Sequence, residues 1–281
     1  HALDILDPAM TVFDLVDDLV AYEQAAPHKA KHVAKCIEGF LSSSDLVIVT
    51  AQTLYDKYGC LATGRIELVP NGFDSSLFSG CRDITVPGGL RDLKRPIVGF
   101  VGVLFDFLDY ELLEYVINDH RDKTFVFVGR TESPVEGRVR RLSKLSNVRF
   151  LGHVPKEQVP SYIRCFDVCL NPFRVDEVAR SAIPLKVFEY LACGKPVVST
   201  RMASLEREAI ASVIYFADDA PHFSRLILHA IKEDSPHAAE ERRVLVEAYT
   251  WDRLFAKVHQ AFLEVAKTRL SSLGRESARR S

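Results

Sequence analysis

Residues 184–200 read PLKVFEYLACGKPVVST, a turn, a short helix and a strand in immediate succession. The run from Leu185 to Cys193 predicts a helix that Gly194 can end. Residues 196–200 are short, apolar and β-branched, which is typical of a buried strand. A helix that leads directly into such a strand belongs to a βαβ unit, so the segment indicates a parallel α/β sheet.

The same alternation of strands and helices extends on both sides of this segment. We expect strands at residues 11–17, 45–50, 65–69, 97–103, 124–129, 147–151, 168–172, 196–200 and 213–216. We expect helices at residues 28–43, 50–58, 109–118, 135–145, 157–165, 185–193, 220–233 and 251–269. Several strands are apolar on both faces, as strands covered on both sides must be. The predicted fold class is α/β, with two Rossmann-like domains built on parallel sheets.

The domain division follows from a weakly patterned stretch at residues 73–95, which contains Pro87, Gly88 and Gly89. We expect an acceptor-side Rossmann-like domain at 1–88, a donor domain at 89–250, and a last helix with a basic tail at 251–281. The first domain has about three strands. Either it is a minimal domain, or its first half lies upstream of His1.

Composition excludes several classes of protein. Lys plus Arg total 36 and Asp plus Glu 38, a balance that argues against a nucleic-acid partner. The six cysteines form no C-x-x-C pair, which favours buried thiols in the cytoplasm over a disulfide framework or a metal site. The apolar runs are shorter than a membrane span requires, and no signal peptide opens the chain.

The residue types at the start of the 185–193 helix suggest a nucleotide site. Free amides at a helix N-terminus favour a phosphate, and Lys186 adds a full positive charge. Glu189 lies three residues later, roughly on the same face, where its carboxylate can accept two ribose hydroxyl hydrogen bonds. A Lys–Glu pair on a solvated helix, with Pro184 as a helix-opening proline, accounts for the spacing about as well.

Four further stretches accompany this segment: VPNGFD at 69–74, GFVG at 99–102, FVG at 127–129 and VRFLGHV at 148–154. Together with 184–200 they resemble, in order and spacing, the motifs of GT-B glycosyltransferases, especially those of glycosyltransferase family 4. Thr250-Trp251 resembles the start of the family's last helix, which crosses back to the first domain. The resemblance covers residues 11–265. Within the family, 166–189 is most similar to a branch that includes teichuronic acid and other cell-surface polysaccharide glycosyltransferases.

The resemblance implies roles for individual residues. Glu189 matches the second Glu of the family's E-x7-E motif and would bind the ribose, while Lys186 and the Leu185 amide would meet the diphosphate. The remaining binding positions implied are Pro184, Ser181, Gly102, Gly129, and Leu151 and His153 beside the base. The donor implied is a nucleotide diphosphate sugar of the UDP or GDP type, with no cofactor and no metal. Transfer with retention is implied, to a glycan or lipid-linked acceptor.

Two positions depart from the family pattern. Ser181 stands where the first Glu of the motif is expected, and Glu177 or Asp176 is a candidate replacement. Residues 103–110 contain no basic residue where the family has an Arg and a Lys, and instead carry Asp106 and Asp109. Lys186, Arg174 or Arg180 would then supply the positive charge. The catalytic residues expected are Glu177, Lys186 and Arg174.

The function expected is that of a hexosyltransferase-type glycosyltransferase in polysaccharide biosynthesis. Two alternatives stay open. One is a non-catalytic nucleotide-sugar-binding scaffold of the same fold, favoured by Ser181, the acidic residues after Gly102 and the short first domain. The other is a nucleotide-sugar epimerase. The basic tail leaves open a peripheral contact with the inner face of the membrane. A homodimer that covers the first domain also stays open.

Overall fold

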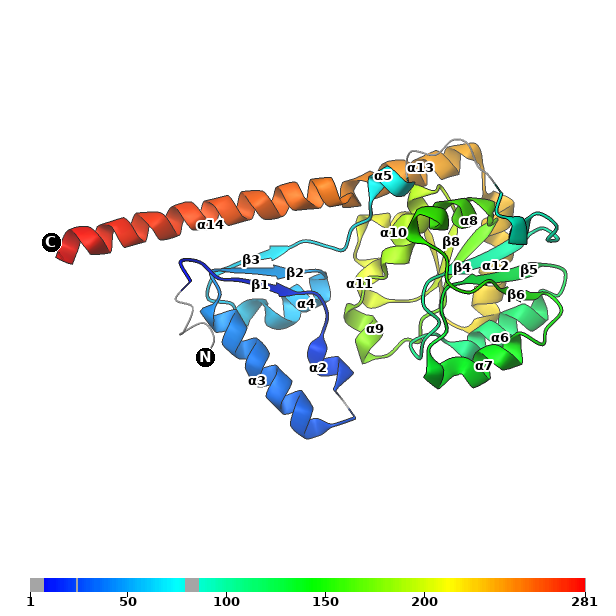
Figure 1. Ribbon diagram of the computed structural model, residues 1–281, viewed down its shortest axis with the longest axis horizontal. Coiled ribbons are helices and arrows are strands. Elements are labelled where there is room, and N and C mark those ends of the chain that lie inside the picture. The colour runs from blue at the N-terminus through cyan, green and yellow to red at the C-terminus, as the bar shows by residue number, and fades with distance from the viewer. Residues whose placement is uncertain (1–7, 24, 79–85, 281) are drawn as a thin grey trace. The chain divides into compact units, whose positions relative to one another are not determined.

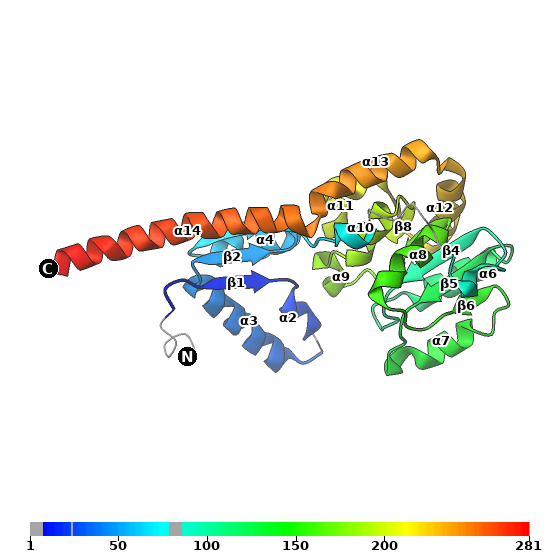
Figure 2. The same ribbon diagram turned by 45° about the horizontal axis from the view of Figure 1, so that its top comes forward.

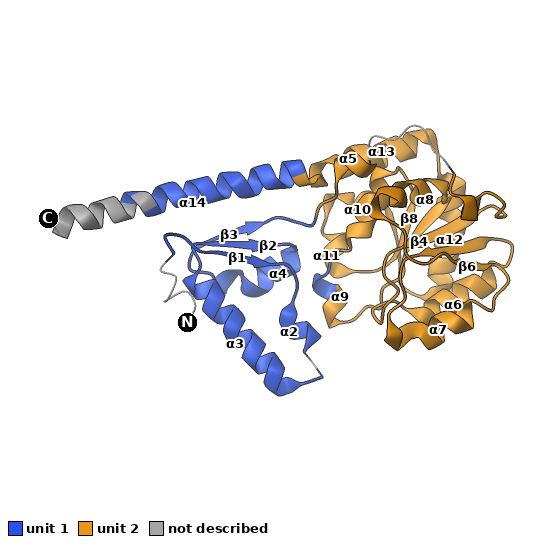
Figure 3. Ribbon diagram, viewed as in Figure 1, with its two compact units in different colours: residues 1–71, 180–183, 252–281 blue, residues 72–179, 184–251 orange. Residues whose placement is uncertain are grey.

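The computed structural model describes residues 8–23, 25–78 and 86–280, with side chains up to Arg269 and at Ser271 (Figure 1). The chain forms two compact units (Figure 3). The first contains residues 1–71, 180–183 and 252–281, and the second contains 72–179 and 184–251. The division after Asn71 places residues 72–88 with the second unit, whereas we expected them in the first domain and its linker.

The first unit is built on a parallel three-stranded sheet in the order β1-β2-β3 (Val12–Leu15, Leu46–Val49, Arg65–Leu68). Helices α2 (Leu19–Tyr22), α3 (Pro27–Ser43) and α4 (Gln52–Tyr58) connect these strands. The central strand is the most buried, because β2 has neighbours on both edges. Ile37 and Leu41 of α3 and Leu54 of α4 complete this small core.

The last helix, α14 (Trp251–Arg280), belongs to the first unit from Asp252 onward, and it extends past Arg269, where we expected it to end. Leu254 and Ala261 are its buried residues, seven positions apart on one face. Polar contacts with β3 accompany them: Lys257 Nζ donates to the Leu68 carbonyl at 2.6 Å, and Arg65 pairs with Glu264. Because α14 is the chain's last element, the first unit is assembled from both ends of the sequence.

The second unit contains a parallel six-stranded sheet in the order β6-β5-β4-β7-β8-β9. Its strands are β4 (Ile97–Val101), β5 (Thr124–Val128), β6 (Val148–Phe150), β7 (Val168–Asn171), β8 (Val197–Thr200) and β9 (Ile214–Ala217). Every residue of β4, β5, β7 and β8 is buried, as the two-sided apolar pattern predicts. All nine expected strands are therefore present in the described part of the chain.

Helices cover both faces of this sheet (Figures 1 and 2). Helices α6 (Tyr110–Asp119), α7 (Glu136–Leu142) and α12 (Ala220–Glu233) lie on one face, where α12 packs against α6. Helices α8 (Val159–Cys165) and α10 (Leu185–Ala192) lie on the other. From β4 the chain adds β5 and then β6 on one side, and it then crosses over to add β7, β8 and β9 on the other side of β4. The strand order therefore reverses between β4 and β7. Ligands of open α/β sheets bind at such a reversal, outside the carboxyl ends of the strands.

Five α-helices in the described residues were not expected from the sequence: α2, α5 (Ser75–Phe78), α9 (Glu177–Ser181), α11 (Ala203–Glu206) and α13 (Pro236–Val246). Helix α13 fixes the end of α10. The buried Arg242 donates from Nε to the Gly194 carbonyl at 3.0 Å and pairs with Asp234. Gly194 has a φ of +73°, so it ends α10 in the left-handed conformation that glycine favours.

Candidate functional site

The loop that follows β4, residues 102–109 and here called the β4 loop, is held by backbone hydrogen bonds on both sides. On one side, Leu104 N donates to the Arg130 carbonyl and Glu132 N to the Leu104 carbonyl, both at 2.9 Å. On the other side, Arg174 N donates to the Phe107 carbonyl at 2.8 Å. The loops after β4, β5 and β7 therefore form one connected layer at the carboxyl edge of the sheet.

Two glycines allow this layer to close. Gly102 has a φ of +141° and Gly129 a φ of +146°, conformations that side-chain-bearing residues rarely adopt. A β-carbon on Gly129 would lie 1.9 Å from the Gly102 carbonyl oxygen, and one on Gly102 would lie 2.9 Å from Cε of Lys186. The groups that lie close to Gly102 in the structure are the Lys186 side chain and the Gly129 backbone.

Helix α10 is attached firmly to the strand that carries this loop. The Tyr190 hydroxyl accepts from Val101 N at 2.8 Å and donates to the Val101 carbonyl at 3.2 Å, and the ring is fully buried. At the other end of the helix, Pro184 is the N-cap and provides no side-chain acceptor. Val187 N donates to the Pro184 carbonyl at 3.1 Å, so Leu185 and Lys186 carry the first two amides of α10 that an anion can reach.

The Lys186 ammonium group lies against two aromatic rings. Its Nζ is 5.2 Å from the centre of the Phe100 ring and 4.6 Å from that of Phe173. Among the described residues, no carboxylate forms an ion pair with it. Burial lowers the pKa of Lys186 to about 8 from the ordinary 10.5, and the nearby charge of Glu189 acts in the opposite direction. A desolvated cation of this kind gains from binding an anion.

Glu189 lies one turn further along α10 and is partly buried. Burial raises the pKa of its carboxyl group, and the charges of Lys156 and Lys186 act in the opposite direction. The sequence left Lys186 and Glu189 equally consistent with a solvated surface pair. Their burial in the structure argues against that reading, because solvated side chains show no such desolvation.

A pocket of about 540 Å³ opens beside Lys186 in the second unit. It is lined by Val103, Phe105, Asp106, Phe107, Glu132, Pro134 and Lys186, and we call it the aromatic pocket. The β4 loop supplies most of its wall. The sequence shows that this loop lacks basic residues but does not indicate a pocket, because Phe105 and Phe107 reach it from a loop whose course only the structure shows.

The two acidic residues of the β4 loop have structural roles. Asp109 caps α6, where its Oδ1 accepts from Leu112 N at 2.9 Å. Asp106 pairs with Arg138 at 2.6 Å, while Arg174 lies 3.9 Å from the other oxygen of Asp106. These contacts offset the negative charge that the sequence places after Gly102.

The other expected site residues lie nearby in sequence but differ in environment. Arg174 is exposed and also pairs with Asp176 at 3.5 Å. Asp176 caps α9, since its Oδ1 accepts from Ala179 N at 3.0 Å. Glu177 is exposed on α9. Ser181 is buried and belongs to the first unit.

Leu151 and His153, the two residues expected beside the base, follow β6. Leu151 N donates to the Phe127 carbonyl at 2.9 Å, and Gly129 N donates to the Gly152 carbonyl at 2.7 Å. These bonds join the loop after β6 to the same layer as the β4 loop. His153 is exposed, so its ring is accessible at the carboxyl edge of the sheet.

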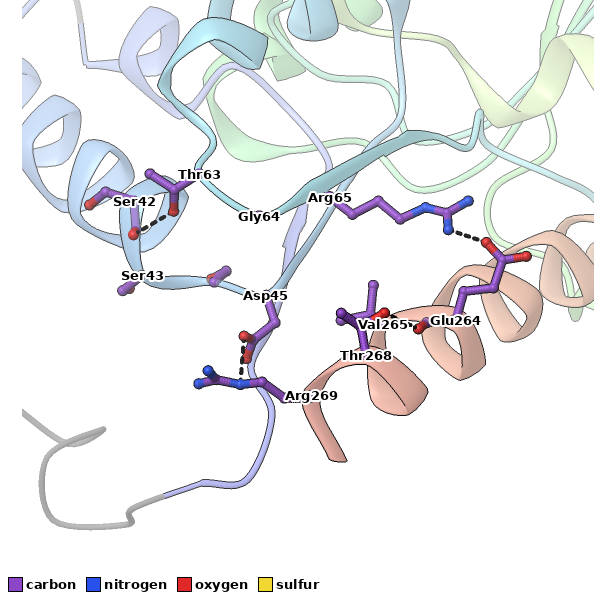
Figure 4. A pocket seen from close by; sticks show the side chains of 11 residues that line it. Ser42, Ser43, Asp45, Thr63, Gly64, Arg65, Glu264, Val265, Thr268 and Arg269 are labelled. Carbon is purple, nitrogen blue, oxygen red and sulfur yellow. Dashed lines mark hydrogen bonds and ion pairs between the residues drawn. The ribbon is translucent and has the colours of Figure 1, made fainter. Parts of the chain in front are cut away.

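A second pocket, of about 730 Å³, lies in the first unit (Figure 4). It is at the amino ends of β2 and β3, not at their carboxyl ends. It is bounded by the residues before β2 and β3 and by α14. The ion pairs Arg65–Glu264 and Arg269–Asp45 cross it, the latter at 3.0 Å. Thr63 and Thr268 donate their hydroxyls to backbone carbonyls, so the wall satisfies its own polar groups.

Residues 95–233 match the family model described as glycosyl transferases group 1. This segment is a group 1 glycosyl transferase domain. It begins just before β4 and ends with α12, and it includes the β4 loop, Lys186 and Glu189.

Similarity to a curated protein extends beyond residues 95–233 of this chain. A teichuronic acid biosynthesis glycosyltransferase of Bacillus subtilis (strain 168), TuaH, is 27% identical over 203 residues, covering 70% of this chain and 51% of the relative. The chain thus spans about half the length of that curated relative.

Two solved structures show the fold. Sucrose-phosphate synthase from Thermosynechococcus elongatus has a TM-score of 0.72 at 19% identity, covering 92% of this chain and 68% of that one. HepE of Anabaena, solved in complex with UDP, has a TM-score of 0.74 at 17% identity, covering 94% and 74%. Together with the two parallel sheets and the returning helix α14, these likenesses confirm the predicted GT-B fold.

One further property concerns membranes. Within residues 8–23, 25–78 and 86–280, no helix combines the length and the apolar character that crossing a bilayer requires.

Proposed function

We propose that this protein is a glycosyltransferase that moves a hexosyl group from a nucleotide diphosphate sugar to a glycan or lipid-linked acceptor, with retention. The single observation that carries the proposal is the desolvated Lys186 at the open start of α10, one turn before the partly buried Glu189. A nucleoside diphosphate offers both partners in this order, a diphosphate for the cation and a ribose for the carboxylate.

The donor base is best supported as uracil. The similar HepE structures contain UDP, and one of them contains UDP and glucose.

The cytoplasmic face of a membrane is the location that we propose for transfer to a lipid-linked acceptor.

The chemistry required of the site is stabilisation of a leaving diphosphate. As the bond from the sugar to the diphosphate breaks, negative charge grows on the phosphate oxygens. Lys186 and the first amides of α10 would stabilise that charge more in the transition state than in the ground state. Arg174 is the second cation we assign to this step, and Glu177 is the carboxylate assigned to the face of the transferred sugar.

The test is thermal unfolding of the full chain with saturating UDP, GDP, dTDP or ADP. A ligand at about 100 times its Kd adds about 2.7 kcal/mol to the free energy of unfolding. For a chain of this size that is a rise in Tm of about 5–10 °C. We expect the rise with UDP, and we expect it to disappear in the Lys186→Ala, Glu189→Ala double variant.

Transfer is tested separately, by incubating the protein with UDP-sugars and glycan acceptors and following UDP release. UDP binding without any release would support a non-catalytic scaffold. Conversion of a UDP-sugar into another UDP-sugar without acceptor would support an epimerase. A protein that binds none of the four nucleotides would overturn the proposal.

A further inference from the structure

The aromatic pocket has an unusual wall for a site next to a diphosphate. Val103, Phe105, Phe107 and Pro134 make it mainly apolar. The Phe105 ring makes edge-to-face contacts with Phe107, at 5.2 Å between ring centres, and with Phe173, at 5.8 Å. Because each ring holds the next, this wall has a defined shape.

The charges of the pocket are compensated with one exception. Asp106 pairs with Arg138 at 2.6 Å, and Glu132 pairs with Arg130 at 3.1 Å. Lys186 is the lining residue for which the described part of the chain shows no ion pair. The pocket therefore offers no unpaired carboxylate to a cationic sugar, and its one available charge suits the diphosphate.

The protein's own backbone holds the β4 loop that forms most of the pocket wall. Backbone hydrogen bonds tie the β4 loop to residues 130–132 on one side and to Arg174 on the other. A ligand group that enters it does not need to order this loop, so its contacts contribute fully to affinity.

The residues that line the pocket indicate which part of a bound nucleotide sugar would lie in it. Lys186 lines it and Glu189 does not. A nucleotide sugar held by its ribose at Glu189 and by its diphosphate at Lys186 would therefore place in the pocket the group beyond the diphosphate, which is the sugar. This step rests on the proposed function.

We propose that the aromatic pocket receives a methyl-bearing substituent of the transferred sugar, either an acetamido methyl or the C6 methyl of a deoxy sugar. A hydroxyl against Val103, Phe105 and Phe107 would lose its hydration without gaining a partner. A methyl group there is removed from water and contacts the rings. The pocket thus selects substituted sugars over a plain hexose.

The test is calorimetric titration of the full chain with UDP, UDP-glucose, UDP-N-acetylglucosamine and UDP-6-deoxyglucose. We expect one of the two substituted donors to bind about tenfold more tightly than UDP-glucose, the discrimination typical of one added methyl group. The better of the two identifies the acetamido or the deoxy source. If UDP-glucose binds as tightly as both, the inference is wrong.

A Phe107→Ala variant separates this inference from the proposed function. We expect it to bind UDP within about twofold of the parent, while the preference for the substituted donor falls to about twofold or less. A Phe255→Ala variant, at a 67% exposed position on α14, is the matched control and should retain the preference. If Phe107→Ala abolishes UDP binding but stays folded by circular dichroism, the pocket holds the nucleotide and the inference fails. If the parent itself does not bind UDP, the proposed function fails first.

Discussion

The Lys186 ammonium nitrogen lies 4.6 Å from the centre of the Phe173 ring, and burial lowers its pKa to about 8. The cation that we assign to the diphosphate is therefore half neutral near pH 8. We expect the Kd for UDP to rise about tenfold for each pH unit above about pH 8, because binding then requires uptake of a proton. Calorimetric titrations between about pH 7 and pH 9.5 measure this slope.

The same group affects the ligand-free protein in the opposite direction. Its folded pKa is below the ordinary 10.5, so between about 8 and 10.5 the unfolded chain binds more protons than the folded one. The free energy of unfolding should therefore rise with pH across that window. Lys186→Met is the control: it should lack this share of the rise and weaken UDP binding at every pH. A parent whose UDP affinity is flat up to pH 9.5 would contradict the assignment.

Gly129→Ala should be among the most damaging small substitutions in the second unit. Its β-carbon would lie 1.9 Å from the Gly102 carbonyl oxygen, at a φ of +146°. We expect a loss of about 2–4 kcal/mol in the free energy of unfolding by urea. Gly137→Ala, on α7 with nothing within 4 Å of the new atom, should be neutral or stabilising by up to about 1 kcal/mol. Equal effects of the two substitutions would refute the close approach.

Tyr190→Phe removes the hydroxyl that bonds both Val101 N and the Val101 carbonyl. We expect a loss of about 1–3 kcal/mol, because these backbone groups are buried and would lose a partner. Since Val101 precedes Gly102, UDP binding should weaken as well. Tyr162→Phe is the control, since none of the hydrogen bonds described here uses the Tyr162 hydroxyl. Both effects are read from urea unfolding and UDP titration of the two variants.

The ribose-binding role that we propose for Glu189 predicts a non-additive result. Removing the 2′-hydroxyl by using 2′-deoxy-UDP should weaken binding to the parent about tenfold, as loss of a hydrogen bond to a charged acceptor does. In Glu189→Gln that penalty should shrink, because the carboxylate acceptor is already gone. A full penalty in the variant would place the ribose elsewhere. The four dissociation constants together form the measurement.

Much of the fold could be predicted because its signals are local. The nine strands are short apolar runs between turn residues, and β4, β5, β7 and β8 are buried on both faces, which gives the clearest pattern. Helix α13 was missed because it is polar and solvated over most of its surface. One of its two buried residues is Arg242, a residue whose type predicts exposure.

The sequence predicts which candidate residues lie together where one segment carries them, but not where several loops meet. Lys186 and Glu189 lie on one helix, so their spacing alone brings them to one face. Phe105 and Phe173 are far apart in sequence, and no local pattern indicates that their rings touch. Asp109 was read as an acidic intrusion, whereas it caps α6, a role that depends on where the helix begins.

The first unit is formed by parts of the sequence that lie on either side of the second unit, and this has a consequence for biosynthesis. Strands β1 to β3 leave the ribosome before the second unit, whereas α14, which contacts β3 through Lys257 and Glu264, leaves after it. The partners Arg65 and Glu264 are separated by 199 positions in the sequence. A nascent chain therefore carries a three-stranded sheet that lacks its α14 contacts while the whole second unit is made, and a ribosome that stops before Trp251 releases the sheet without this helix. Such chains are natural clients of chaperones.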